Sequence, residues 1–126
     1  MGFATLLENM KTALSTIDGI ETCKIGLEAD LVPTDYPMIR IVPSKITPSR
    51  TLGRRRAEVL VYFGADLQEF EGGLEATYAA LSEMEEAIIT AAGQSPAFGA
   101  VHLDTTMDED RIEAYKLMAL RFDVEG

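Results

Sequence analysis

The sequence predicts an α+β domain in which two main helices pack on a largely antiparallel, mixed sheet of about five strands. Two stretches place apolar residues three and four apart, which is typical of amphipathic helices. Shorter stretches show the alternation of strands. The predicted order is helix, three strands, helix, two strands. Because the strands come in runs, this order favours α+β over strict β-α alternation. A length of 126 residues fits one domain, so residues 1–126 are assigned to a single core.

The first helix is predicted to begin near Phe3 and to end at Asp18-Gly19, since glycine readily adopts the left-handed conformation that follows a helix. Its apolar stripe consists of Phe3, Leu6, Leu7, Met10, Ala13, Leu14 and Ile17.

Three strands are predicted to follow, at residues 21–27, 38–42 and 56–64. The first carries Cys23, the single cysteine, which excludes an intramolecular disulfide and is interpreted as a small buried thiol. Pro43 cannot donate to a sheet ladder, so the second strand ends there or lies at an edge. The third strand is apolar on both faces and is therefore predicted to be central and covered on both sides. One of its faces carries Ala57, Val59, Val61 and Phe63, and the other carries Glu58, Leu60 and Tyr62.

A second helix is predicted over residues 71–92, closed by Gly93 and Pro96. Its inward face consists of Leu74, Tyr78, Leu81, Glu85, Ile88 and Ala92. Two final strands are predicted at residues 99–105 and 112–124, joined by a turn at 107–110. The core side of the last strand is expected to carry Ile112, Ala114, Met118, Leu120 and Phe122.

Charge is distributed unevenly along the chain. The net charge is −10, yet residues 40–56 hold six basic residues and no acidic one. We name this set the basic arm: Arg40, Lys45, Arg50, Arg54, Arg55 and Arg56. Residues 44–55 lack apolar periodicity and are predicted to form a projecting, mobile loop. Such a loop is longer than a hairpin needs, which suggests that it has a role.

Three interpretations of the Arg54-Arg55-Arg56 cluster compete: a nucleic-acid patch, a solvated loop without a role, and a contact between subunits. Duplex binding needs a broad basic face, which an acidic chain does not offer. A basic arm on an acidic body is well suited to meeting other copies of itself. We therefore expect the basic arm to form an oligomer interface. A sheet face that the two helices leave uncovered would be a second candidate for an oligomer interface.

Groups that could carry catalysis are sparse. His102 is the only histidine, and neither serine nor cysteine lies near it in sequence. Asp104, Asp108, Glu109 and Asp110 superficially resemble a calcium loop, but Glu109 occupies the position that requires glycine. No glycine-rich phosphate loop is found. We predict no catalytic, cofactor-binding or metal-ligating residue. A small ligand-binding domain or enzyme that uses the acidic turn near His102 is the alternative, and cation binding at Asp108–Asp110 stays open.

The chain shows no apolar run of the ~20 residues that a membrane helix needs, and its first ten residues lack the basic cluster of a signal peptide. The sequence therefore predicts a cytosolic protein.

Several segments resemble bacteriophage tail terminator and tail completion proteins, the group that includes the lambda minor tail protein U. The order of elements is similar, and the likeness of pattern spans nearly the whole chain. The segments that carry it are the helix Leu6–Leu14, the strand Tyr36–Ile41, the basic loop, the strand Val59–Gly64 and the strand Leu117–Phe122.

The resemblance implies a structural virion protein without enzymatic activity or cofactor. It implies a homo-oligomeric ring, commonly a hexamer, that caps the tail tube and then joins the head connector or completion protein. Assembly would take place in the host cytoplasm and end in the virion tail. Genomic DNA would pass through the lumen without specific binding, which an acidic inner surface would favour. Lys45–Arg56 matches the extended loop that contributes to assembly in such rings.

Overall fold

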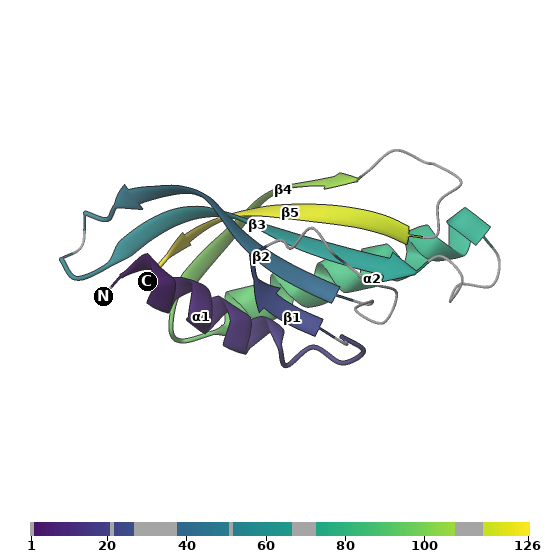
Figure 1. Ribbon diagram of the computed structural model, residues 1–126, viewed down its shortest axis with the longest axis horizontal. Helices are drawn as coiled ribbons and strands as arrows, with labels where there is room; N and C mark the ends of the chain where they lie inside the picture. Colours follow the sequence, from purple (N-terminus) through teal and green to yellow (C-terminus); the bar gives the residue numbers. More distant parts are fainter. Residues whose placement is uncertain (1, 21, 27–37, 51, 67–72, 108–114) are drawn as a thin grey trace.

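The computed structural model describes residues 2–20, 22–26, 38–50, 52–66, 73–107 and 115–126. Its elements are α1 (Phe3–Leu14), β1 (Thr22–Ile25), β2 (Met38–Pro48), β3 (Arg55–Asp66), α2 (Gly73–Gln94), β4 (Gly99–Met107) and β5 (Tyr115–Glu125). The α+β class and the order of elements predicted from the sequence are confirmed (Figure 1).

The described strands form one mixed sheet in the order β1-β2-β3-β5-β4. Only β1 and β2 pair in parallel, and the other neighbours are antiparallel. The sheet is therefore largely antiparallel, and β3 lies at its centre, as predicted. Since β3 and β4 both run antiparallel to β5, α2 connects two parallel strands as a crossover and covers one face of the sheet.

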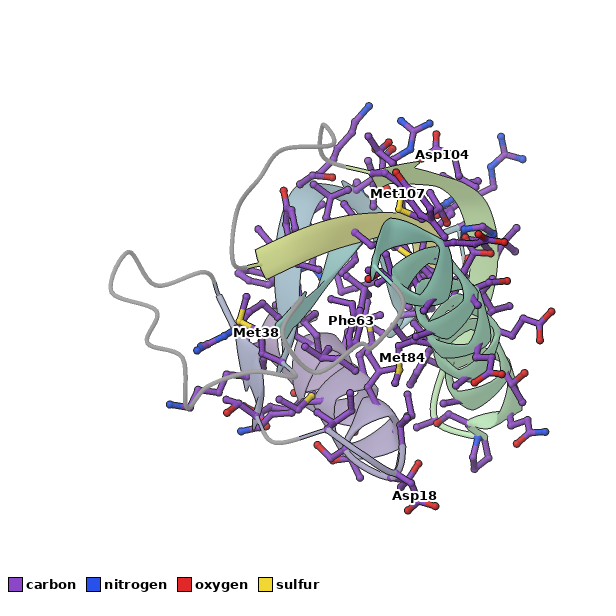
Figure 2. All side chains as sticks on the ribbon, turned by 90° about the vertical axis from the view of Figure 1, so that its right-hand side faces the viewer. Asp18, Met38, Phe63, Met84, Asp104 and Met107 are labelled. Atoms are coloured by element: carbon purple, nitrogen blue, oxygen red, sulfur yellow. The ribbon has the colours of Figure 1, made fainter. Side chains whose placement is uncertain are left out.

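Both helices lie on the same face of the sheet, below it in Figure 1. The core fills the space between them, and Figure 2 shows Phe63 pointing into that space. On β3 and β5 the buried residues alternate as the pleat requires, with Val59 and Val61 on β3 beside Leu120 and Phe122 on β5. The predicted inward face of β3 is thus confirmed. Its other face is only partly buried, so the expectation that β3 is covered on both sides is wrong.

The helices differ from the prediction in the end of α1, which lies at Leu14 rather than at Asp18-Gly19, and in two side chains. Phe3 opens α1 and is exposed, whereas Leu6, Leu7, Met10 and Leu14 are buried. On α2 Leu81, Ile88 and Ala92 are buried as predicted, but Thr77 rather than Tyr78 joins them. At ~3.6 residues per turn, Thr77 lies about 40° from Leu81 around the helix and Tyr78 about 60°. The longer side chain therefore lies at the boundary of the buried stripe, where Tyr78 is 38% exposed. The side chain of Leu74 lies outside the described residues.

The largest difference concerns the loop predicted at residues 44–55. Ser44–Pro48 continue β2, and Arg55 begins β3, so residues 49–54 alone connect the two strands. The two alternatives for Pro43 are also resolved. Among the described residues β1 pairs with Met38–Ile41 only, so Pro43 lies where β2 has no described neighbour on that side, beside a bulge between Pro43 and Lys45. The Ser44 hydroxyl at this bulge donates to the Glu58 carbonyl at 3.0 Å.

At the C-terminus, Met118, Leu120 and Phe122 are buried on β5 as predicted, and Val124 extends this row. Ile112, Ala114 and the acidic turn at residues 108–110 lie outside the described residues.

Candidate assembly surface

The β2–β3 hairpin forms one end of the molecule and reaches past the N-terminal end of α1 (Figure 1). Its connection carries Arg50, Leu52 and Arg54, all exposed, and the Leu52 side chain is 100% exposed. Gly53 has φ +81°, a conformation that favours glycine and closes the turn. We call Arg50, Leu52, Gly53 and Arg54 the hairpin tip.

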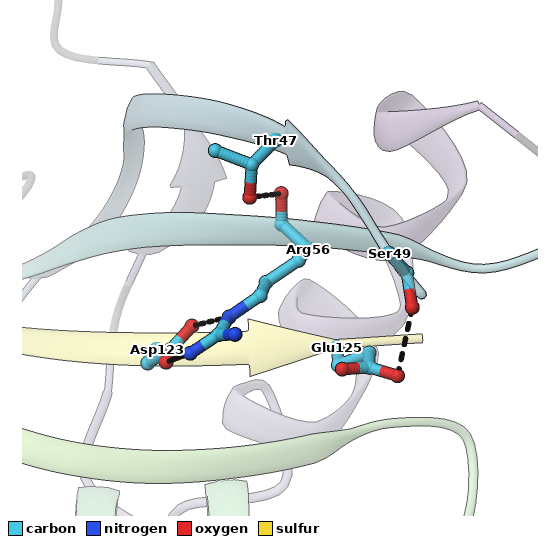
Figure 3. Close-up of polar contacts among 5 residues, drawn as sticks. All are labelled: Thr47, Ser49, Arg56, Asp123 and Glu125. Atoms are coloured by element: carbon cyan, nitrogen blue, oxygen red, sulfur yellow. Dashed lines mark hydrogen bonds and ion pairs between the residues drawn. The ribbon is translucent and has the colours of Figure 1, made fainter. Parts of the chain in front are cut away.

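The base of the hairpin is fixed to the C-terminus of the chain. Arg55 and Gly126 exchange two backbone hydrogen bonds, of 2.9 and 3.0 Å. The Ser49 hydroxyl donates to Oε1 of Glu125 at 2.9 Å (Figure 3). These contacts hold the strands together up to the turn, so the hairpin tip is presented on an ordered ladder.

Arg56 forms a bidentate ion pair with Asp123 on β5 (Figure 3). Its Nε donates to Oδ1 at 2.9 Å and its second guanidinium nitrogen donates to Oδ2. The hydrogen bond from Arg56 lowers the pKa of the Asp123 carboxyl, and the same contact raises the pKa of Arg56. Arg56 is therefore occupied within its own chain.

The structure does not gather the basic arm into one surface. Arg40 is only 1% exposed and lies within β2 between β1 and β3, so its assignment to an exposed interface is wrong. Arg56 forms its ion pair with Asp123. The remaining four are exposed, and none forms an ion pair with another residue in the described part of the chain. We call these four the exposed cations: Lys45, Arg50, Arg54 and Arg55.

The sheet face opposite the helices carries charges that largely neutralise one another. Arg121 on β5 bridges Glu58 on β3, at 3.4 Å, and Asp104 on β4, at 2.5 Å. A hollow of about 500 Å³ lies beside this network, lined among others by Lys45, Arg56 and Leu103. We call this surface the open sheet face.

Two apolar side chains on β4 are also exposed. Val101 is 62% exposed and Leu103 is 45% exposed. Val101 is opposite Asp123 in the register, and Leu103 lines the hollow, so both belong to the open sheet face. The helices thus leave one sheet face exposed at these residues, as the sequence analysis considered. The use of this face as an interface stays a prediction.

His102 and Asp104 do not converge. His102 is opposite Phe122 on the helix side, with ring centroids 5.5 Å apart, and its Nε2 lies 2.8 Å from the Thr105 hydroxyl. Asp104 is opposite Arg121 on the other face, because a bulge at Leu103 separates the two residues. The described residues thus offer no joint His102–Asp104 site for the alternative enzyme or ligand-binding function.

Cys23 lies on β1, half-buried, with its Sγ 3.9 Å from the Lys11 carbonyl. Burial raises the pKa of its thiol, which keeps the thiol protonated and weakly nucleophilic. This agrees with a structural role, although the side chain is less buried than predicted.

The helix side carries the opposite charge. α2 contains Glu75, Glu83, Glu85 and Glu86 and no basic residue. A groove of about 540 Å³ runs between α2 and the turn after α1, with Asp18, Glu83 and Glu86 among its lining residues. Figure 2 shows Asp18 and Met84 on this side, away from Asp104. The sequence analysis missed this helix groove. The i, i+3 spacing of Glu83 and Glu86 outside the apolar stripe was its only local signal.

Among the described residues, no helix combines the length and apolar character needed to cross a membrane. Comparison of the chain with models of known protein families and with curated proteins yields no match.

Proposed function

We propose that this protein is a structural subunit that assembles into a homo-oligomeric ring, and that the ring terminates a bacteriophage tail. The observation that carries the proposal is the β2–β3 hairpin, which holds the exposed cations at one end of an otherwise acidic protein. Exposed opposite charges on one chain attract copies of that chain to each other.

Two further observations support assembly. The open sheet face leaves Val101 and Leu103 in solvent, and such apolar exposure on a sheet is typical of an interaction surface. The order of elements also agrees with the resemblance to tail terminator proteins.

In the proposed assembly the subunits form a closed ring, a hexamer in the family that the chain resembles. One rim of the ring contacts the tail tube protein and the other contacts the head completion or connector protein. DNA passes through the lumen, and the excess of carboxylates keeps the DNA from adhering. No reaction is assigned to the protein.

Electron microscopy of the purified protein tests the proposal. We expect closed rings of uniform diameter at low salt. Arg54→Glu should reduce the fraction of subunits in rings, whereas Lys24→Glu, an equal charge reversal at an exposed strand position away from the hairpin, should not. Images that contain single subunits only, at every concentration and salt, would contradict the proposal.

A further inference from the structure

We propose that the helix groove of one subunit receives the hairpin tip of the next. The inference rests on the proposed self-assembly and goes further, because it names the surface that the hairpin meets. The partner is a second copy of this chain.

The hairpin tip has the form of an apolar knob between two cations. Leu52 exposes its whole side chain to water, and Arg50 and Arg54 stand two residues away on either side. Such an exposed leucine gains free energy only if a partner buries it, because apolar area removed from water stabilises a complex by roughly 25 cal/mol per Å². The arginines restrict that partner to one that offers carboxylates.

The helix groove has the complementary composition. Ile17, Met84 and Ala87 supply half-buried apolar lining. Asp18, Glu83 and Glu86 supply exposed carboxylates around it. A volume of about 540 Å³ exceeds what one leucine side chain needs. A tip with an apolar centre and cationic flanks thus matches a groove with an apolar lining and anionic flanks.

Other surfaces of the described chain match less well. The neighbouring hollow between α1 and the α2 C-terminus, lined among others by Asn9, Thr12 and Gln94, carries no charged residue. On the open sheet face Glu58 and Asp104 already pair with Arg121, so these carboxylates are less available to a second cation.

The hairpin tip and the Asp18 end of the groove lie apart within one copy. The hairpin lies beyond the N-terminal end of α1, whereas Asp18 follows its C-terminal end (Figure 1). The 12 residues of α1 place its N-terminal end about 18 Å from its C-terminal end, beside which Asp18 lies, at ~1.5 Å per residue. Each copy therefore offers its tip to one neighbour and its groove to another. Such a head-to-tail contact generates a ring when the rotation between neighbours closes.

A charge-exchange experiment tests the contact. The tip variant carries Arg50→Glu and Arg54→Glu, the groove variant carries Glu83→Arg and Glu86→Arg, and a third protein combines all four. We expect the tip and groove variants each to weaken self-association by at least about tenfold, and the combined protein to regain most of it, since several exposed pairs act together. Sedimentation across concentrations measures association, and circular dichroism confirms that each subunit is folded.

Controls separate this inference from the proposed function. Lys24→Glu with Glu8→Arg exchanges exposed charges outside the tip and the groove and should leave association unchanged. Leu52→Ser should weaken association without altering the circular dichroism. If the wild type assembles but the tip and groove variants assemble equally well, or the combined protein is not restored, the tip–groove contact is wrong while self-assembly stands. If the wild type does not assemble at any concentration, both proposals are wrong.

Discussion

The two halves of the β2–β3 ladder have different surroundings. In one half Ile39, Ile41, Val59 and Val61 are buried between the sheet and the helices. In the other half only Ile46 and Ala57 pack against the core, and Lys45 and Arg56 are exposed. One ladder therefore combines a stabilising core with a projecting surface.

The charges of the two regions differ in the same way. The hairpin carries cations that have no ion-pair partner in the described part of their own chain, whereas α2 carries four glutamates and no basic residue. Between them, the pairs Arg56–Asp123 and Arg121–Glu58 lie on strands and connect neighbours within the sheet. The paired charges of the sheet thus connect strands within the subunit, and the exposed cations of the hairpin and the glutamates of α2 remain available to other subunits.

The largest expected effect lies in the helix-covered half. Leu81→Ala should lower the free energy of unfolding by about 2–5 kcal/mol, because the side chain is fully buried against the sheet. Glu83→Ala, two residues further on the solvent side, should change it by less than about 0.5 kcal/mol. Denaturant melts of both variants provide the measurement, and equal shifts would contradict the observed helix face.

Amide exchange should separate the two halves of the ladder. Val59–Tyr62 of β3 pair with strands on both sides, so their amides should exchange only in rare, extensive openings. Lys45–Thr47 pair with β3 alone among the described strands, so their amides should exchange at least about a hundredfold faster. Similar rates in both segments would mean that the hairpin is protected by something other than its own ladder.

The arginines of the hairpin should differ from one another. Arg56→Glu places a carboxylate beside Asp123 and should lower the Tm of the subunit, because the ion pair becomes a repulsion. Arg54→Glu replaces an exposed cation and should leave the subunit Tm unchanged while weakening association. Thermal melts at concentrations below assembly make the comparison, and equal Tm values for the two variants would contradict these roles.

The smallest expected effect concerns pH. Arg56 lowers the pKa of Asp123 below its ordinary value of 3.8, so the folded state holds this proton less tightly than the unfolded chain does. The pair therefore contributes its full stability above pH 3.8 and loses it as the pH falls through the lowered pKa. The difference in Tm between wild type and Asp123→Asn should be constant at neutral pH and should close in acid. A difference that grows on acidification would contradict the pair.

The sequence predicts the buried half of the molecule well, because burial imposes a period on the residues. Val59, Val61, Leu120 and Phe122 alternate, and their strands are found where the alternation places them. Beyond Ser44 only Ile46 and Ala57 of the hairpin pack against the core, so too few apolar residues are present to mark a period, and pairing with β3 makes residues 44–48 part of a strand. The polar residues in this segment are typical both of a loop and of an exposed hairpin.

Contacts between residues that are distant in the sequence could not be predicted from the sequence either. Arg56 and Asp123 are 67 positions apart, and the helix groove joins residues of α2 with residues of the turn after α1. Arg40 lies among the same basic residues in the sequence, yet it is buried in β2 between β1 and β3. Clustering of charge along the chain therefore overestimated the exposed basic surface.

The mass of the wild-type particle tests the central claim most directly. Light scattering at several protein concentrations should give one discrete mass that is a multiple of the subunit mass, and raising the salt should shift it toward the subunit, because screening acts over ~8 Å at physiological ionic strength. A mass equal to one subunit at every concentration and at low salt would contradict the account.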